Sequence, residues 1–448
     1  MKKLLPLAVG LLALPALSCL RSDPPRPRNV LVLLVDTLRA DHLGAYGYGR
    51  PTSATFDAFA KGNLFFRQVR SQASCTFPSV NSLLTSRFPQ AFLGQPEGMG
   101  IPAAIPSLAE ILQQKGYRTA AVSASPIMRK SPTRFNPHGG FERGFASFAE
   151  DCLWQSAECV NRKGLEQLEV ADPRPFFLYL HYIDPHGPYS PPPGYRRRFA
   201  TGTSDKAFIR DGDPNPIAAH LYQGAVDPGV TPADVQHLID LYDDEIAYFD
   251  GQLKVLLKVL KKSGRLDDTI VILASDHGEG FLEHGHMKHC RTLFDSEIRT
   301  PLAMSIPGVP AQAIDRPVEN LDIVPTVLDY LGLGTEGRGL AGRSLRPLFE
   351  RRQAPEALER STIGVFRAVS DGRFKLIHDL VSRRFQLFDL AADPKETQDV
   401  LALHRRDFHR LRLALSDWLA RTEGMARSES VKRAEMEERK LRSLGYIE

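Results

Sequence analysis

The sequence has very little net charge. It contains 57 Lys and Arg against 53 Asp and Glu residues, a formal net charge of +4. It also lacks any Lys/Arg block interleaved with aromatic residues, which a nucleic-acid-binding groove requires, so nucleic acid is not an expected partner. With 42% hydrophobic and 25% charged residues among 448, the chain is an ordinary globular protein with room for a large buried core.

Long apolar runs are scarce too, and the one at the N-terminus is too short for a comfortable membrane span. Two lysines, this apolar run and small residues before Cys19 form a signal-peptide pattern. The tetrapeptide ALSC (16–19) resembles a bacterial lipoprotein box, in which Cys19 would carry the lipid; simple cleavage is the alternative. We expect residues 1–19 to direct export, residues 20–28 to be a linker, and the protein to be periplasmic or lipid-anchored to a bacterial membrane.

Short apolar runs alternate with helical patterns along the rest of the chain. Residues 29–36, 117–125, 175–184 and 269–276 are apolar almost throughout, as strands buried on both faces of a parallel sheet are. Helices are predicted over 105–116 and 231–264, the second with Thr231 as cap and Gly264 at its end. This alternation predicts an α/β fold with a doubly wound, mostly parallel sheet.

Potential ligand residues follow these strands. In a parallel sheet, ligands bind beyond the carboxyl ends of the strands. An Asp after a single strand is commonly a turn residue or a helix cap, but several such residues at corresponding ends favour a metal or catalytic site. They are Asp36, His181, Asp184, His186, Asp276 and His277.

Six blocks, in order, resemble the sulfatase family of the alkaline-phosphatase-like superfamily. They are 35–66, CTFPSVNSLLTS (75–86), FFLYLHYIDPHGPYSPP (176–192), ASDHGEGFLEHGHMKH (274–289) with IRTPL (298–302), LDIVPTVLDYLGL (321–333) and FQLFDLAADPKE (385–396). The resemblance implies a catalytic domain over 29–345 and a smaller C-terminal α+β subdomain with a helical tail over 346–448.

The resemblance also implies roles for individual residues. Asp36, Asp276 and His277 match ligands of a divalent metal, with the nucleophile as a further ligand. His186 and His289 match positions that contact the anionic group or its leaving oxygen, and Arg39 is a further candidate for substrate binding. A metal and imidazoles neutralise the charge of an anionic ester, most strongly in the transition state.

The nucleophile departs from the usual family pattern. Ordinary sulfatases carry Cys or Ser two residues before the proline of C-x-P-S-R and oxidise it to formylglycine. Here that residue is Thr76; Cys75 lies one place too early, and Val80 replaces the Arg. Formylglycine is therefore not expected. Thr76 resembles the metal-bound threonine nucleophile of phosphoethanolamine transferases and lipoteichoic acid synthases, although it could instead simply cap the helix that begins near Pro78.

Two other family features are missing. Thr37 stands where a second Asp is usual, and AVSASPIM (121–128) replaces the G-K-W-H stretch that binds sulfate. The first loss weakens the case for calcium, and the metal could be Ca, Zn, Mn or Mg. The second loss weakens the case for sulfate as the substrate group. Asp184, His186, His284, His286 and His289 could hold a second metal, or the 283–289 stretch could be an exposed loop.

The cysteines allow one further hypothesis, which rests on these roles. If Cys75 and Cys290 both adjoin the active site of an exported protein, they could form a disulfide, and Cys152 and Cys159 would then pair locally. Buried thiols are the alternative.

Together these features predict a metal-dependent hydrolase of sulfate or phosphate esters, with Thr76 favouring phosphoester hydrolysis or phosphotransfer. The alternatives are a true sulfuric ester hydrolase and a catalytically degenerate binding lipoprotein.

Overall fold

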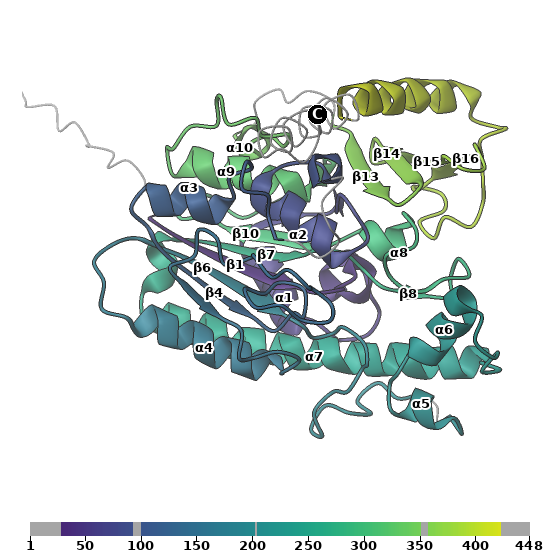
Figure 1. Cartoon of the computed structure of the whole chain (residues 1–448), viewed down its shortest axis with the longest axis horizontal. Coiled ribbons are helices and arrows are strands. Elements are labelled where there is room, and N and C mark those ends of the chain that lie inside the picture. Colours follow the sequence, from purple (N-terminus) through teal and green to yellow (C-terminus); the bar gives the residue numbers. More distant parts are fainter. Residues whose placement is uncertain (1–27, 93–99, 202–203, 351–356, 423–448) are drawn as a thin grey trace, which may run out of the picture.

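The computed structural model describes residues 28–92, 100–201, 204–350 and 357–422. The predicted signal peptide with Cys19 and the end of the chain after residue 422 lie outside the described residues. Figure 1 shows a large central sheet between two layers of helices and, beside it, a small sheet near the C-terminal end of the described chain. No helix in these four ranges is both long enough and apolar enough to cross a membrane.

The central sheet has eight strands, in the order β11-β2-β10-β7-β1-β6-β4-β5. The five neighbours from β7 to β5 are parallel, while β10 is antiparallel to both its neighbours. The strands are β1 (Asn29–Val35), β2 (Leu64–Phe66), β4 (Arg118–Ser123), β5 (Ser147–Ala149), β6 (Phe176–Tyr182), β7 (Thr269–Ser275), β10 (Leu302–Ser305) and β11 (Gln312–Ile314). The predicted mostly parallel sheet is thus confirmed, and β1, β4, β6 and β7 fall within the four apolar runs.

The register of the sheet determines where the site forms. Val35 at the end of β1 pairs with Tyr182 of β6 on one side and with Ser275 of β7 on the other. Because all three strands run in the same direction, the residues that follow them emerge together at one edge. Asp36 and Asp276 are the first residues after β1 and β7, so hydrogen-bonded neighbours place the two carboxylates side by side.

Alternate side chains of β1 enter two separate cores. Leu31 and Leu33 pack with one layer, made by α1 (Ala54–Gly62), α4 (Ala157–Glu169) and α7 (Pro232–Lys262). Val30 and Val32 pack with the other layer, which contains α2 (Thr76–Thr85), α3 (Leu108–Gln114) and α9 (Ile323–Tyr330). Thr231 caps α7 as predicted, and it forms a capping box with Asp234. The two layers lie on opposite faces of the sheet (Figure 1).

Shorter elements complete the large domain. They are β3 (Val69–Arg70), β8 (Gly280–Phe281), β9 (Met287–Lys288), β12 (Val318–Glu319), α5 (Ala207–Arg210), α6 (Asn215–Gln223), α8 (Asp295–Ile298) and α10 (Arg346–Phe349). The hairpin of β8 and β9 carries His289 at its end.

The small sheet is antiparallel and contains β13 (Glu359–Ile363), β14 (Phe366–Ser370), β15 (Phe374–Asp379) and β16 (Phe385–Asp389). Its Val369, Leu376 and Leu387 pack against Leu411 and Trp418 of the helix that covers 405–422. Buried ion pairs join it to the large domain: Lys375 Nζ lies 2.7 Å from Asp295 Oδ1, and the Asp295 carboxylate also binds Arg70. The predicted smaller C-terminal sheet is therefore present.

Candidate active site

Four predicted residues meet where β1 and β7 end. His277 Nε2 lies 3.7 Å from Asp36 Oδ1 and 3.6 Å from Asp276 Oδ2. Thr76, the first residue of α2, has its Oγ1 3.1 Å from the same His277 nitrogen. All four residues are buried. The structure thus brings the predicted metal ligands and the predicted nucleophile to one point.

His181 belongs to the same cluster. It occupies β6, and its Nε2 lies 3.5 Å from Asp36 Oδ2. Ligand atoms of Asp36, His181 and Asp276 all lie within 4.8 Å of one another. The sequence analysis placed His181 at the ligand edge of the sheet but not among the metal ligands, because it lies within the apolar strand. Tyr179 lies two residues earlier in the same strand. Its hydroxyl is 2.9 Å from His181 Nδ1 and fixes the ring.

The cluster fits a divalent cation. Asp36 Oδ1, Asp276 Oδ2 and His181 Nε2 are buried without a hydrogen-bond partner, and two adjacent carboxylates are costly to bury unless a cation offsets them. Ligand atoms 3.1–3.7 Å apart suit neighbours bound at about 2.0–2.6 Å to one ion. Carboxylate, imidazole and hydroxyl donors accept Ca, Mg, Mn or Zn.

The pKa values of the two carboxylates move in opposite directions. Burial raises the pKa of Asp276 to about 6, and the charge of Asp36 adds to this effect. Burial also acts on Asp36, but there the neighbouring His181 and the charges of His186 and His277 outweigh it and hold the pKa of Asp36 below its usual range. The site therefore concentrates negative charge on Asp36.

His186 and His289 lie side by side, with ring centroids 5.1 Å apart, and His289 is also 4.6 Å from the His277 ring. The Nδ1–H of His186 donates to the Gly187 carbonyl, and that of His289 donates to Glu279 Oε1. Carbonyl and carboxylate oxygens only accept, so these bonds assign the proton to Nδ1 and leave both Nε2 atoms for a substrate. Burial lowers the pKa of His289 to about 4, against the opposing charge of Glu279.

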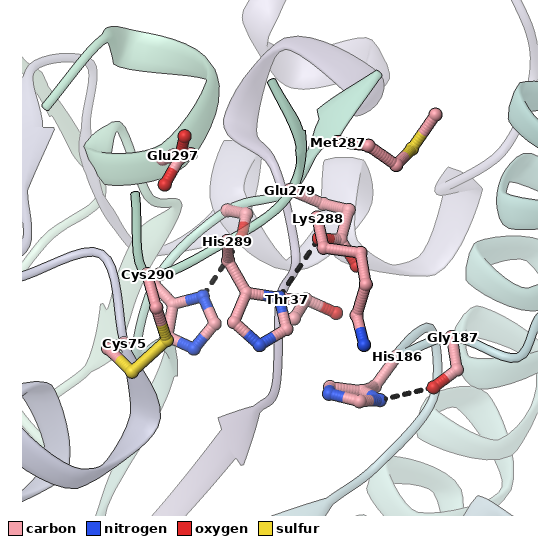
Figure 2. Close-up of polar contacts among 12 residues, drawn as sticks. Thr37, Cys75, His186, Gly187, Glu279, Met287, Lys288, His289, Cys290 and Glu297 are labelled. Carbon is pink, nitrogen blue, oxygen red and sulfur yellow. Dashed lines mark hydrogen bonds and ion pairs between the residues drawn. A yellow bond between two sulfur atoms is a disulfide. The ribbon is translucent and has the colours of Figure 1, made fainter. Parts of the chain in front are cut away.

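Thr76, Asp36, His186 and His289 line one cavity of 660 Å³. Figure 2 shows the side chains of His186, Lys288 and His289 extending into the same space beside the Cys75–Cys290 disulfide. Arg39 is not among the residues that line it. Arg39 is 5% exposed, and its guanidinium binds Asp41, Glu283 and the Glu279 carbonyl. In this structure Arg39 therefore links the loops that carry these residues.

The residues considered for a second metal do not gather into a second cluster. In the four described ranges, one group of His, Cys, Asp and Glu atoms is close enough to share an ion, and it is the one above. His284 stacks on Phe294 at 3.6 Å, and His286 stacks on Tyr222. Asp184 is buried, and burial raises its pKa to about 7.

Both hypothesised disulfides are present, Cys75–Cys290 and Cys152–Cys159. Cys75 is therefore not a free thiol.

Comparisons with known proteins agree with this architecture. Residues 28–333 match the Sulfatase family model, and residues 282–423 match the model for the C-terminal region of N-sulphoglucosamine sulphohydrolase. The first match covers more than half of the chain, so the protein belongs to the sulfatase family. It is a hydrolase of sulfate or phosphate esters, as predicted.

Among curated relatives, human N-sulphoglucosamine sulphohydrolase is 27% identical, covering 88% of this chain and 90% of its own. Choline-sulfatase of Rhizobium meliloti is 28% identical over 50% of this chain and spans 46% of its own length. Among solved structures, a phosphonate monoester hydrolase from Silicibacter pomeroyi superposes with a TM-score of 0.71 at 20% identity, covering 88% of this chain and 95% of its own. A putative sulfatase from Bacteroides fragilis gives 0.73 at 17% identity, with coverage of 92% and 98%. These two structures support the fold.

Proposed function

We propose that the protein is an exported, metal-dependent phosphoester hydrolase or phosphotransferase of the sulfatase family, with Thr76 as its nucleophile. The observation that carries the proposal is the contact of Thr76 Oγ1 with His277 Nε2, 3.1 Å apart at the end of the cavity that Asp36, His186 and His289 also line. A hydroxyl that only capped α2 would accept a backbone N–H of the first turn. The cap position of α2 is Cys75, and the hydrogen bond given for the Thr76 hydroxyl in the described chain is the one to His277.

Thr76 has a suitable place for attack on an anionic ester. It is the first residue of a ten-residue helix, whose amino end carries N–H groups without helical partners. In the first step the Thr76 oxygen bonds to phosphorus and gives up its hydroxyl proton, and the bond to the alcohol oxygen breaks as that oxygen takes up a proton. In the second step, water or another alcohol takes the phosphoryl group from Thr76, which regains its proton.

His186 and His289 serve the anion and the leaving oxygen. Their Nδ1–H bonds to Gly187 and Glu279 fix both rings, so each Nε2 is presented at a constant position. The negative charge of a bound ester favours the protonated form of each ring, and a proton on Nε2 can then bond a phosphoryl oxygen or pass to the departing alcohol.

Asp36, Asp276, His277 and Thr76 remain the proposed metal ligands, and the structure adds His181 as a fifth group at the same point. A divalent cation bound there would offset the charge of the ester and lower the pKa of a hydroxyl. The protein's contribution is to hold these ligands in place without water, because Asp36, Asp276 and His277 are at most 1% exposed.

Sulfate ester hydrolysis is the second candidate. The supporting observation is that a sulphohydrolase is among the relatives aligned over most of both chains. Two disulfides in the described chain support the proposed export, with or without the lipid at Cys19.

The test is hydrolysis of 4-nitrophenyl phosphate, the corresponding diester and the sulfate, with and without Ca, Mg, Mn and Zn. Thr76→Val removes the hydroxyl at nearly constant volume and should lower kcat/KM by about a thousandfold or more. Thr85→Val is the matched control, since the Thr85 hydroxyl bonds Asn81 at the far end of the same helix. A preference for sulfate would favour the second candidate, and no hydrolysis with any cation would contradict both.

A further inference from the structure

Among the residues that line the cavity and that the proposed chemistry does not use, four carry a positive charge or an exposed aromatic ring. They are Arg134, Phe135, Trp154 and Lys288, which we call the outer subsite. Phe135 and Trp154 are each 43% exposed, although large aromatic side chains are usually more buried than this. Their rings meet edge to face at 6.0 Å, and the Trp154 ring lies 5.6 Å from the His186 ring. The exposed aromatic surface is therefore continuous with the proposed reaction centre.

Trp154 is held in place by its backbone. It has a positive φ of 56°, a conformation that residues other than Gly rarely adopt. Its N–H donates to the Ala124 carbonyl, and the Cys152–Cys159 disulfide closes the loop around it. An exposed indole on so constrained a loop loses little freedom when it packs against a ligand.

Phe135 is ordered in a similar way. Its N–H and that of Asn136 donate to Thr133 Oγ1. Asn136 is fully buried, and its side-chain amide donates to the Ile127 carbonyl. The two rings thus come from two separately braced loops and form one fixed surface.

The outer subsite is also cationic. The Arg134 guanidinium lies over the Phe135 ring at 4.5 Å, and Lys288 Nζ donates to Asn215 Oδ1 at 2.8 Å. Within the described ranges neither cation pairs with a carboxylate, and Asp36, at the reaction centre, is the one acidic residue among those that line the cavity. A second negative group on a substrate would therefore meet positive charge there.

We propose that the outer subsite selects esters whose alcohol part is a ring that has an apolar face and carries a second anionic group. This inference rests on the proposed function and adds the substrate class to it. The ring face packs on Trp154 and Phe135, and the anionic substituent contacts Arg134 and Lys288. An aromatic ring and a pyranose with an apolar face share this chemistry.

The kinetic test compares methyl, phenyl and 4-carboxyphenyl esters, each as phosphate and as sulfate, with hexose and hexuronic acid esters as the pyranose arm. Trp154→Ala should lower the preference for phenyl over methyl in kcat/KM about tenfold, and Trp154→Phe should restore much of it. Arg134→Gln with Lys288→Met should lower the preference for the acidic ring over the neutral ring about tenfold. The methyl ester has no ring to pack there, so in each variant its kcat/KM should fall less than that of the ring esters.

Two controls keep the result interpretable. Phe135→Ala removes the neighbouring ring without touching the constrained Trp154 backbone, and it should act in the same direction. Arg67→Gln removes an exposed arginine that pairs with Asp315 outside the cavity, and it should change neither preference. Unchanged preferences in both the aromatic and the cationic variants would overturn the outer subsite.

A binding measurement separates this inference from the proposed function. Calorimetry with 4-carboxyphenylphosphonate on Thr76→Val protein needs no turnover. Affinity that falls about tenfold on adding Trp154→Ala supports the outer subsite even if no ester is hydrolysed. Hydrolysis that depends on Thr76, together with ligand binding indifferent to Trp154, Arg134 and Lys288, would leave the proposed function standing and overturn the outer subsite.

Discussion

Cys75, the residue before the proposed nucleophile, is bonded to Cys290, the residue after His289. The backbone reinforces this link, because the Cys290 N–H donates to the Ser74 carbonyl at 2.7 Å. One covalent bond thus joins the loop that presents Thr76 to the hairpin that presents a proposed anion-binding histidine, across a sequence separation of 215 residues.

Replacing Cys75 and Cys290 together by Ser should lower both stability and activity. In the chain-entropy model a cross-link spanning that separation is worth about 5 kcal/mol, against about 2.5 kcal/mol for the short Cys152–Cys159 loop. Denaturant unfolding of the two double-Ser variants tests this order. The Cys75/Cys290 variant should also lose kcat on every ester, because Thr76 and His289 are no longer held together. Equal kcat in the variant and the wild type would contradict that role.

The gathering of Asp36, Asp276 and His277 was predictable because it follows from strand direction alone. Apolar runs revealed β1 and β7, and parallel neighbours end at the same edge of the sheet. The prediction that Thr76 lies beside these residues rested on the resemblance of its motif to a family pattern. Hydrophobic periodicity could not predict it, because periodicity indicates which face of α2 is buried but not where its first residue lies relative to β1 and β7.

The outer subsite escaped the sequence analysis for a physical reason. Arg134, Phe135 and Trp154 lie in loops, which carry no hydrophobic period, and their positions depend on a positive φ, an Asn side chain and a disulfide. The short sequence separation between Cys152 and Cys159 suggested local pairing. Nothing in the sequence indicated that the loop between them places Trp154 at the cavity. Arg39 is a sequence candidate for substrate binding, and in the structure its guanidinium pairs with the carboxylates of Asp41 and Glu283.

Tyr242 of α7 positions the turn that follows Asp36. Its hydroxyl donates to the Thr37 carbonyl at 2.7 Å and accepts the Arg39 N–H at 2.9 Å. Thr37 has a φ of 57°, a strained value for a β-branched residue that needs such support. Tyr242→Phe should therefore weaken divalent-cation affinity about tenfold, measured by calorimetry or by the cation-induced rise in Tm.

Tyr46→Phe provides the matched control for this variant. The Tyr46 hydroxyl likewise bridges two backbone groups, Phe66 O and Leu302 N, but on strands away from the proposed ligands. Both variants should lose about 1 kcal/mol of unfolding free energy, and only Tyr242→Phe should lose cation affinity. Equal cation affinities would show that Tyr242 is merely structural.

Lys375 should be essential to the attachment of the small sheet. Its side chain is buried, and Nζ lies 2.7 Å from both Asp295 Oδ1 and Glu396 Oε1. Lys375→Met leaves two buried carboxylates short of a partner and should cost about 3–5 kcal/mol of unfolding free energy. Arg410→Met, which breaks a half-exposed pair with Asp371 on the same subdomain, should cost about 0–1 kcal/mol. Similar losses in denaturant unfolding would refute the distinction.

Glu297 should make the stability depend on pH. Its side chain is 1% exposed and accepts the Thr292 hydroxyl and the N–H groups of Arg291 and Thr292, yet no cation pairs with it in the described chain. Burial raises the pKa of Glu297 from 4.5 to about 7, and the charge of Glu279 acts in the same direction.

The sign follows from proton binding. Between pH 4.5 and about 7 the folded protein holds a proton on Glu297 that the unfolded chain has lost, so this contribution to stability is full below pH 4.5 and vanishes as pH rises through about 7. Its size is about 3 kcal/mol at most. Glu297→Gln is neutral at every pH because Gln does not titrate. It also fits the site, since the Gln oxygen can accept the two N–H groups while its amide donates to the Thr292 hydroxyl. The unfolding free energy of Glu297→Gln relative to wild type should therefore rise from near zero at pH 4.5 to about 3 kcal/mol at pH 8. A difference that stays constant over this range would mean that Glu297 is already ionised in the folded protein at pH 4.5.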